Sequence, residues 1–183
     1  MIGDLPKALT VDGREYDIDS DFRTALLIFE AFGDAELSSL NKQFTMLELL
    51  YNPIVPPDID EASKQAVWFL DVGQDEKQKN KNVHNPKTMD YKQDEQLLFS
   101  AVNAVATRDV REAEYMHWWT FYGLCQAIDS ESLIAHIINI RSKRAKGEKL
   151  EKHELKFYHE NIHLIEFRTS DEDYQKMVAL LRR

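Results

Sequence analysis

The segment His159-Glu160-Asn161-Ile162-His163 reads H-E-x-x-H, a residue pattern found in many zinc-dependent hydrolases. On a helix, two histidines four residues apart share one face and can bind the same Zn²⁺ ion. The glutamate between them then acts as general base on a zinc-bound water. Apolar residues at helical spacing over residues 150–167 predict such a helix, so this pattern taken alone predicts a zinc hydrolase.

The sequence lacks the rest of a catalytic zinc site. Such a site needs a third protein ligand, and one common extension of the pattern requires Gly at position 166 and His at position 169. This chain has Glu166 and Thr169 there, so His159, His163 and Glu166 are the only candidate ligands. We therefore expect a solvated helix face, with no catalytic residue and no cofactor. A zinc-dependent hydrolase remains an alternative function.

The single cysteine, Cys125, offers little chemistry in its sequence context. It lies in an apolar stripe and too far along one helix from His117 to meet that histidine, so we expect an inert buried thiol. One cysteine cannot form an internal disulfide, which is typical of a reducing compartment. The chain also has no glycine-rich phosphate-binding loop.

Local signals predict a mainly α-helical fold with a small N-terminal β-hairpin. Asp12-Gly13 between two short alternating segments predicts a hairpin over residues 8–18, which must pack on helices or pair with another chain. Leu40, Phe44, Leu47 and Leu50 form the apolar stripe of one helix. Ser130 is expected to cap another. Apolar spacing predicts about eight helices, at residues 22–33, 38–51, 58–70, 90–105, 115–125, 133–144, 150–167 and 170–181.

The length of 183 residues fits a single domain over residues 1–183. Residues 73–89 are polar and without apolar periodicity, which predicts a flexible surface loop. The C-terminal helices, residues 150–182, are candidates for a subdomain. Their last helix is predicted from a capping-box pattern at residues 170–173, followed by apolar residues at helical spacing.

Charge and hydropathy narrow the function classes. The formal net charge of −9 argues against general nucleic-acid binding, which needs a cationic surface. No apolar run is long enough to span a membrane and no N-terminal signal is visible, so we expect a cytoplasmic protein. Residues 1–40 are strongly acidic, whereas residues 141–156 are basic. Two solvated faces explain this difference, and attraction between neighbouring subunits of a homo-oligomer is the alternative.

Trp118 and Trp119 are adjacent on a predicted helix, where neighbouring side chains point about 100° apart. Both can be buried only under a broad cover. We interpret them as part of a wide core helix. The alternative is that one of the two indoles is exposed and anchors a binding partner.

These aromatic residues also carry a family resemblance. The sequence resembles bacteriophage tail assembly chaperones of long-tailed phages and prophages of Gram-positive bacteria, whose gene usually lies just before the tape-measure gene. The matching segments lie between residues 11 and 145 and follow the family's order. They are Tyr16-Asp17-Ile18-Asp19-Ser20-Asp21-Phe22-Arg23, Trp68-Phe69, Tyr91 with Asp94, Phe99-Ser100-Ala101, Met116-His117-Trp118-Trp119-Thr120-Phe121 and Ile140-Arg141.

The resemblance implies a non-enzymatic function in the cytoplasm of the infected or lysogenic host. Such chaperones bind the long tape-measure protein and keep it soluble for tail-tube polymerisation. The tape-measure protein is therefore the expected partner, with the tail-tube protein as a second. A structural tail or connector component of the virion is an alternative. Matching positions suited to partner binding are Phe22, Arg23, His117, Trp118, Trp119 and Arg141.

Overall fold

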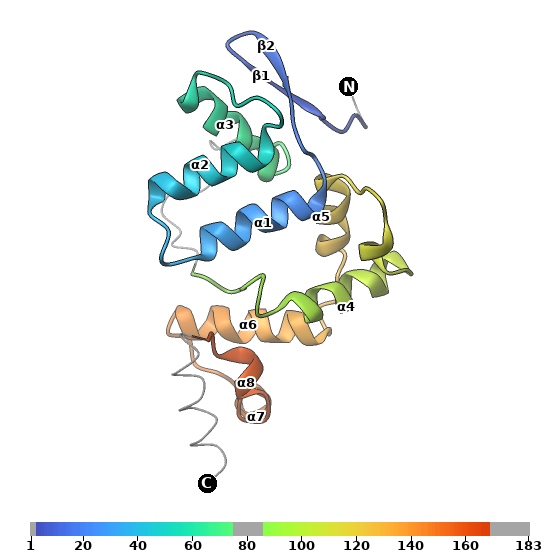
Figure 1. Ribbon diagram of the computed structural model, residues 1–183. Coiled ribbons are helices and arrows are strands. Elements are labelled where there is room, and N and C mark those ends of the chain that lie inside the picture. The colour runs from blue at the N-terminus through green and yellow to red at the C-terminus, as the bar shows by residue number, and fades with distance from the viewer. Residues whose placement is uncertain (1–2, 75–85, 169–183) are drawn as a thin grey trace. The chain divides into compact units, whose positions relative to one another are not determined.

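The structure is a computed structural model, and it describes residues 3–74 and 86–168. Within these residues the fold is mainly helical, with eight α-helices and an N-terminal two-stranded antiparallel hairpin (Figure 1), as the sequence predicted. A 3₁₀ turn, Val110–Glu112, lies between the fourth and fifth helices. The elements are β1 (Ala8–Val11), β2 (Arg14–Asp17), α1 (Phe22–Gly33), α2 (Ser39–Leu50), α3 (Ile59–Leu70), α4 (Glu95–Ala106), α5 (Trp118–Gln126), α6 (Leu133–Ala145), α7 (Lys152–Glu160) and α8 (Ile162–Ile165).

The chain divides into two compact units. The first unit comprises Met1–His84 and Val102–Ile128, and the second comprises Asn85–Ala101 and Asp129–Arg183. The chain passes from the second unit back to the first within α4. The sequence-based expectation of one domain, with a C-terminal subdomain from residue 150, stays a prediction, because compactness alone does not establish independent folding.

Two predicted segments lie largely outside the described residues. The expected flexible loop falls mostly on residues 75–85, and the expected last helix falls on residues 170–181.

The hairpin packs on the helices of the first unit. Asp12 (φ 49°) and Gly13 (φ 73°) both adopt positive φ, as a two-residue type I′ turn requires. Leu9 pairs with Tyr16 and is buried together with Val11, and β1 lies against α3. This packing supplies the support that an isolated hairpin lacks.

Side-chain caps set the starts of the first three helices. Asp21, Ser38 and Asp58 each accept a hydrogen bond from a backbone N–H in the first turn of α1, α2 and α3, respectively. The helices bury their apolar faces around a common core. The buried residues of these three helices include Phe22, Ala25, Ile28, Met46, Leu47, Leu50, Ala62, Ala66 and Phe69.

The second unit has its own apolar core, formed by Ile137, Ile140, Leu150 and Ile165. Leu97, Phe157, Tyr158 and Leu164 pack against it. The predicted cap of α6 is wrong: Ser132, not Ser130, accepts a hydrogen bond from the Ala135 N–H. Asp129 forms a turn before it by accepting from the Glu131 N–H, which moves the cap two residues along the chain.

The single helix predicted for residues 150–167 is also wrong. α7 ends at Glu160 and α8 begins at Ile162, with Asn161 between them in a non-helical conformation (φ −121°, ψ 24°). The Asn161 side-chain amide donates to the Phe157 carbonyl at 3.0 Å. Asparagine breaks the helix here because its side chain competes with the backbone for hydrogen bonds.

Candidate functional site

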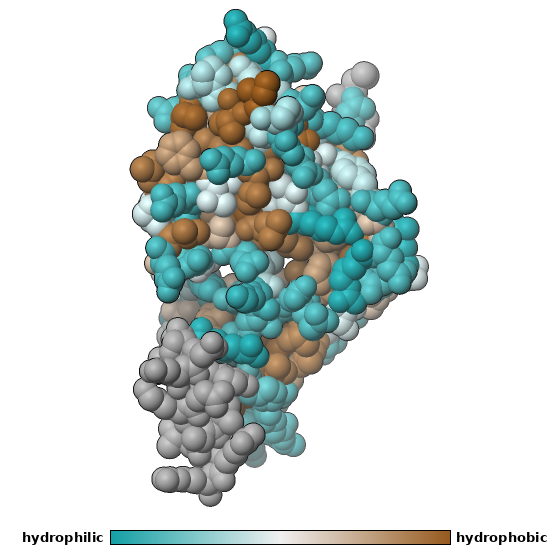
Figure 2. Space-filling model, in the orientation of Figure 1, coloured by the Kyte–Doolittle hydropathy of each residue, from teal (hydrophilic) through white to brown (hydrophobic). Residues whose placement is uncertain are grey.

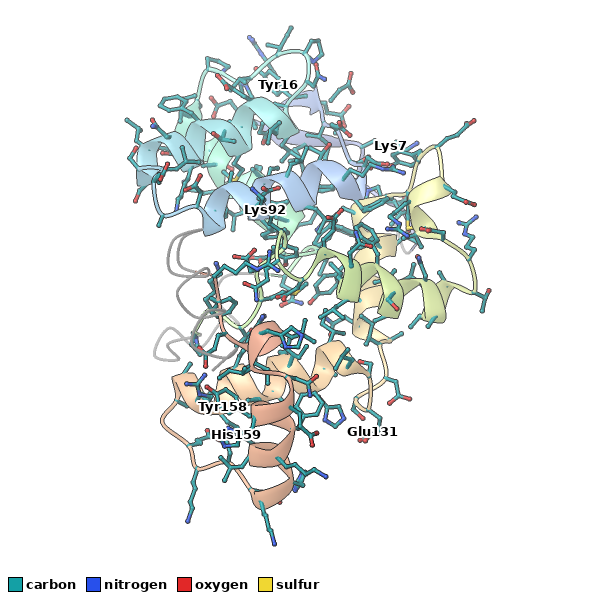
Figure 3. The ribbon with its side chains drawn as sticks, turned by 60° about the horizontal axis from the view of Figure 1, so that its bottom comes forward. Lys7, Tyr16, Lys92, Glu131, Tyr158 and His159 are labelled. Carbon is teal, nitrogen blue, oxygen red and sulfur yellow. The ribbon has the colours of Figure 1, made fainter. Side chains whose placement is uncertain are left out.

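The break at Asn161 separates the two histidines of the H-E-x-x-H pattern. His159 and Glu160 end α7, whereas His163 lies in α8, so the pattern is not on one continuous helix. His159 and His163 are exposed, and the His159 ring lies edge-on to Tyr158 at 5.5 Å between centroids (Figure 3). The spacing that would place both imidazoles over one ion requires an unbroken helix.

The third candidate zinc ligand, Glu166, has protein partners. Its carboxylate accepts a hydrogen bond from the Tyr158 hydroxyl at 2.5 Å and pairs with Arg144. In the portion of the chain that the structure describes, no three His, Cys, Asp or Glu side chains are placed together to hold a metal ion. The interpretation of residues 159–163 as a solvated face without a metal stays a prediction.

Cys125 is partly buried in α5, and desolvation raises the pKa of its thiol to about 12. The thiol is therefore protonated at neutral pH, whereas the thiolate is the nucleophilic form.

A set of polar contacts in the first unit joins the start of α1 to the start of α5. The sequence predicted a helix over residues 115–125, with His117 inside it. In the structure α5 begins at Trp118, and His117 is its N-cap. Its Nδ1 accepts from the Trp119 N–H at 3.0 Å, so Nε2 carries the proton and donates to the Pro6 carbonyl at 2.9 Å. The buried ring is therefore neutral and hydrogen-bonded at both nitrogens.

The two tryptophans that follow His117 donate hydrogen bonds to the C-terminal end of α3. The indole N–H of Trp118 donates to the Leu70 carbonyl at 2.9 Å, and that of Trp119 donates to the Phe69 carbonyl at 2.8 Å. The last carbonyls of a helix have no partner within it, so the Trp118 bond supplies a donor to the Leu70 carbonyl, whereas the Phe69 carbonyl also accepts from the Val72 N–H at 3.1 Å. Gly73 (φ 79°) makes room for this approach, because a Cβ there would meet the Trp119 ring at 3.1 Å.

The two indoles differ in burial. Trp118 is 4% exposed and packs on Phe29 and Phe121, whereas Trp119 is half-buried. The core interpretation therefore fits Trp118 fully, and Trp119 is the indole with accessible surface.

Phe22 and Arg23 also make contacts where the start of α1 meets the start of α5. The Phe22 ring is fully buried and stacks on Phe121 at 4.4 Å. The Arg23 guanidinium pairs with Asp21 and donates to the carbonyls of Arg111 and Ala113. Arg23 thereby ties α1 to the segment that leads into α5.

The burial of His117 gives a pH dependence with a defined sign. Desolvation lowers the pKa of His117 below its usual 6.5, although the bond to Pro6 opposes this effect. The unfolded chain therefore binds a proton more readily, and stability that is present above pH 6.5 is lost as the pH falls through the lower folded pKa. We expect the free energy of unfolding to fall between pH 7.5 and 5.5 by at most about 1.4 kcal/mol per pH unit from this group.

Urea unfolding at pH 7.5, 6.5 and 5.5, followed by tryptophan fluorescence, measures this slope. The His117→Asn variant is the matched comparison, because asparagine also serves as an N-cap and does not titrate. We expect a shallower slope for the variant. Equal slopes in both proteins would rule out the effect.

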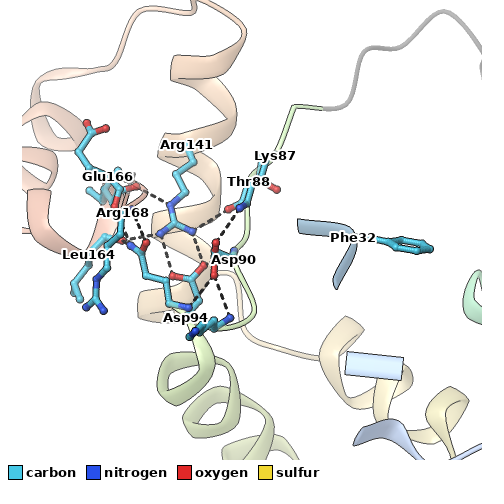
Figure 4. A network of polar contacts seen from close by, with 12 residues as sticks. Phe32, Lys87, Thr88, Asp90, Asp94, Arg141, Leu164, Glu166 and Arg168 are labelled. Carbon is cyan, nitrogen blue, oxygen red and sulfur yellow. Dashed lines mark hydrogen bonds and ion pairs between the residues drawn. The ribbon is translucent and has the colours of Figure 1, made fainter. Parts of the chain in front are cut away.

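Arg141 forms the equivalent polar centre of the second unit (Figure 4). All five N–H donors of its buried guanidinium have acceptors. Two donate to the Asp94 carboxylate at 2.5 and 3.0 Å, and the others donate to the carbonyls of Ile165, Thr88 and Leu164 at 2.7, 3.1 and 2.7 Å. The guanidinium also lies 4.2 Å from the centroid of the Phe167 ring. Asp94 and Arg141, which are both positions of the family resemblance, form a paired buried charge.

The six partner-binding candidates therefore fall into two groups. Phe22, Arg23, His117, Trp118 and Trp119 gather at one junction in the first unit, whereas Arg141 belongs to the second unit. Phe22, His117, Trp118 and Arg141 are buried in structural contacts, which leaves Arg23 and Trp119 as the candidates with accessible surface. Their role in partner binding stays a prediction.

An exposed apolar surface on α1 and α2 is the feature that residue patterns did not reveal. We define the α1–α2 face as Leu27, Leu40 and Phe44, whose exposed fractions are 52%, 59% and 43%. Figure 2 shows apolar side chains gathered over these two helices. Leu40 and Phe44, expected on one apolar stripe with Leu47 and Leu50, are exposed instead, because burial of α2 is confined to its second half.

Acidic side chains border the α1–α2 face. Glu30 follows Leu27 on α1, and Glu48 follows Phe44 on α2; both are exposed. The one lysine of α2, Lys42, donates to the Phe32 carbonyl. The first unit as a whole contains 19 acidic against 10 basic residues and so carries the entire formal net charge of −9. An apolar strip with a negative border suits an apolar partner with basic flanks.

The fold and these sites define a mainly helical protein with an exposed apolar helical face. Among the described residues, no helix combines the length and apolar character needed to cross a membrane. The chain belongs to the Bacteriophage Gp15 protein family, whose family model matches residues 1–164. Comparisons with curated proteins and with solved structures find no match.

Proposed function

We propose that this phage protein is a tail assembly chaperone that binds the tape-measure protein and keeps it soluble during tail morphogenesis. The α1–α2 face carries the proposal. Monomeric proteins usually cover contiguous apolar side chains on neighbouring helices, and exposed ones with a polar border mark binding surfaces. Membership of a bacteriophage family and the resemblance to tail assembly chaperones support the same function.

The chemistry of the face suggests the form of the client. Exposed apolar side chains on two adjacent helices suit an amphipathic helix that lays its apolar side against them. The acidic border, with Glu30 and Glu48, favours basic residues on the polar flanks of that helix. The net negative charge also keeps complexes of chaperone and client dispersed.

Co-expression with the tape-measure protein of the same phage tests the proposal. We expect the tape-measure protein to be soluble with the chaperone and to precipitate without it. The double variant Leu40→Ser with Phe44→Ser should weaken binding by about 10- to 100-fold, because each exposed apolar side chain contributes roughly 1 kcal/mol when covered. Affinity is measured by titrating labelled chaperone with purified soluble fragments of the client.

Leu155→Ser is the matched control, because Leu155 lies in the second unit and is 42% exposed. This control should bind the client as the natural protein does. A client that is equally insoluble with and without the protein contradicts the proposal. Mass spectrometry of mature phage particles distinguishes a chaperone from a structural component. Presence of this protein in the particles would indicate a structural tail or connector component instead.

A further inference from the structure

Among the described residues, the outer edge of β1 has no partner strand. In an antiparallel hairpin with a two-residue turn, every second residue pair is hydrogen-bonded. These pairs are Val11 with Arg14 and Leu9 with Tyr16. The Ile18 N–H continues the alternation by donating to the Lys7 carbonyl at 2.9 Å. The backbone N–H and C=O groups of Ala8 and Thr10 therefore point away from β2. Within residues 3–74 and 86–168, these groups have no hydrogen-bond partner. We call them the free edge of β1.

A groove runs along this edge. A cavity of about 820 Å³ is lined by Ala8, Leu9 and Thr10 on one side and by residues of α3 from Asp60 to Trp68 on the other. β1 is four residues long, which corresponds to roughly 13 Å of extended chain at about 3.3 Å per residue. The groove therefore has the length and the hydrogen-bonding groups to accept a short extended segment.

The two edges of the hairpin differ in their protection. β2 has the sequence Arg14-Glu15-Tyr16-Asp17, and its charged side chains are exposed. Charged residues on an edge strand prevent pairing with other chains. β1 has the sequence Ala8-Leu9-Thr10-Val11 and carries no charge. Only β1 therefore presents an edge that is open to strand addition.

The groove is acidic. Asp12, Asp58, Asp60 and Glu61 line it, against the one lysine Lys64. Hydrogen bonds from Gln65 and Lys64 lower the pKa of Glu61, which keeps this carboxylate ionised at neutral pH. An occupant with lysine or arginine side chains is thus favoured over a neutral or acidic one.

We propose that the free edge of β1 binds an extended basic segment of a partner protein, which adds to the hairpin as a third strand. Main-chain hydrogen bonds to Ala8 and Thr10 hold the segment, and its alternate basic side chains meet the carboxylates of the groove. This site is separate from the α1–α2 face and does not depend on the identity of the client proposed above.

Binding of a fluorescein-labelled eight-residue peptide of alternating lysine and valine tests the proposal, with the full-length protein and fluorescence anisotropy. We expect saturable binding, and no binding of the matching glutamate–valine peptide. Thr10→Pro should weaken binding at least tenfold, because proline removes the free-edge N–H while an edge strand tolerates it. Glu15→Pro is the control, since it removes the corresponding N–H on the edge of β2, and it should change affinity less than twofold.

The double variant Asp12→Asn with Asp60→Asn tests the charge without altering the backbone, because Asn-Gly suits the same turn. It should also weaken binding at least tenfold. Hydrogen exchange should show slower exchange of the Thr10 amide in the presence of the peptide. The proposal is overturned if Thr10→Pro and Glu15→Pro bind alike, if the Thr10 amide is not protected, or if the lysine and glutamate peptides bind equally.

Discussion

Replacing Arg141 by alanine is expected to lower the free energy of unfolding by about 3–5 kcal/mol. Arg141 is 4% exposed, and all donors of its guanidinium are paired. Its removal leaves the buried Asp94 carboxylate without its counter-charge and the Thr88 and Ile165 carbonyls without their guanidinium donor, whereas the Leu164 carbonyl still accepts from the Gln93 side chain. An unpaired buried charge costs far more than the ion pair itself contributes.

Urea unfolding followed by far-ultraviolet circular dichroism measures this loss. All three tryptophans, Trp68, Trp118 and Trp119, belong to the first unit, so their fluorescence, recorded in parallel, follows that unit. Arg144→Ala is the control, because Arg144 pairs with Glu166 at the surface and such pairs contribute about 0–1 kcal/mol. Similar losses in the two variants would show that the Arg141 contacts are not structural.

A double variant removes both partners of the Asp94–Arg141 ion pair. Exchanging Asp94 and Arg141 together for apolar residues, as in Asp94→Ala with Arg141→Met, removes both charges. We expect this double variant to recover part of the stability lost in Arg141→Ala, because no unpaired charge remains.

Replacing Trp118 by alanine is expected to cost about 3–5 kcal/mol, as for other buried aromatic residues. Its ring is packed between Phe29, Phe121 and Tyr122, and its N–H holds the last carbonyl of α3. Trp118→Phe separates these two contributions. It keeps an aromatic ring and leaves the Leu70 carbonyl without its donor, so about 1–3 kcal/mol should be lost.

Circular dichroism of the urea transition is again the measurement, since the substitutions alter tryptophan fluorescence itself. Trp119→Ala is the internal comparison. Its indole makes the same kind of bond to the Phe69 carbonyl but is only half-buried, so we expect a smaller loss than for Trp118→Ala. If Trp118→Ala were the milder change, the assignment of Trp118 to the core would be wrong.

The contacts of Arg141 and Trp118 suggest a structural role for the residues that carry the family resemblance. Asp94 with Arg141 and Trp118 with His117 hold helices together within their units, whereas the α1–α2 face lies on other residues. We infer that the resemblance largely reflects the fold, and that client recognition depends on side chains such as Leu40 and Phe44.

Several elements were determined by the sequence alone. Asp12-Gly13 specifies the hairpin because both residues tolerate positive φ, and Asp21 starts α1 by accepting a hydrogen bond from the Arg23 N–H. Both signals act within a few residues and need no other part of the fold. Where two local signals competed, prediction was less exact: Asn161 broke a helix whose apolar spacing was continuous, and Ser132 replaced Ser130 as a cap.

Tertiary structure alone decided the polar centres and the exposed face. Asp94 and Arg141 are 47 positions apart, and the Trp118 indole reaches a carbonyl 48 positions away. Nothing near these residues in the chain indicates their partners. Leu40 shows the same dependence, because apolar spacing identifies a helix face but only the packing of neighbouring helices determines how much of that face is covered. Local hydrogen bonding therefore determined the elements, and burial by distant segments determined which side chains hold the fold and which are accessible to a partner.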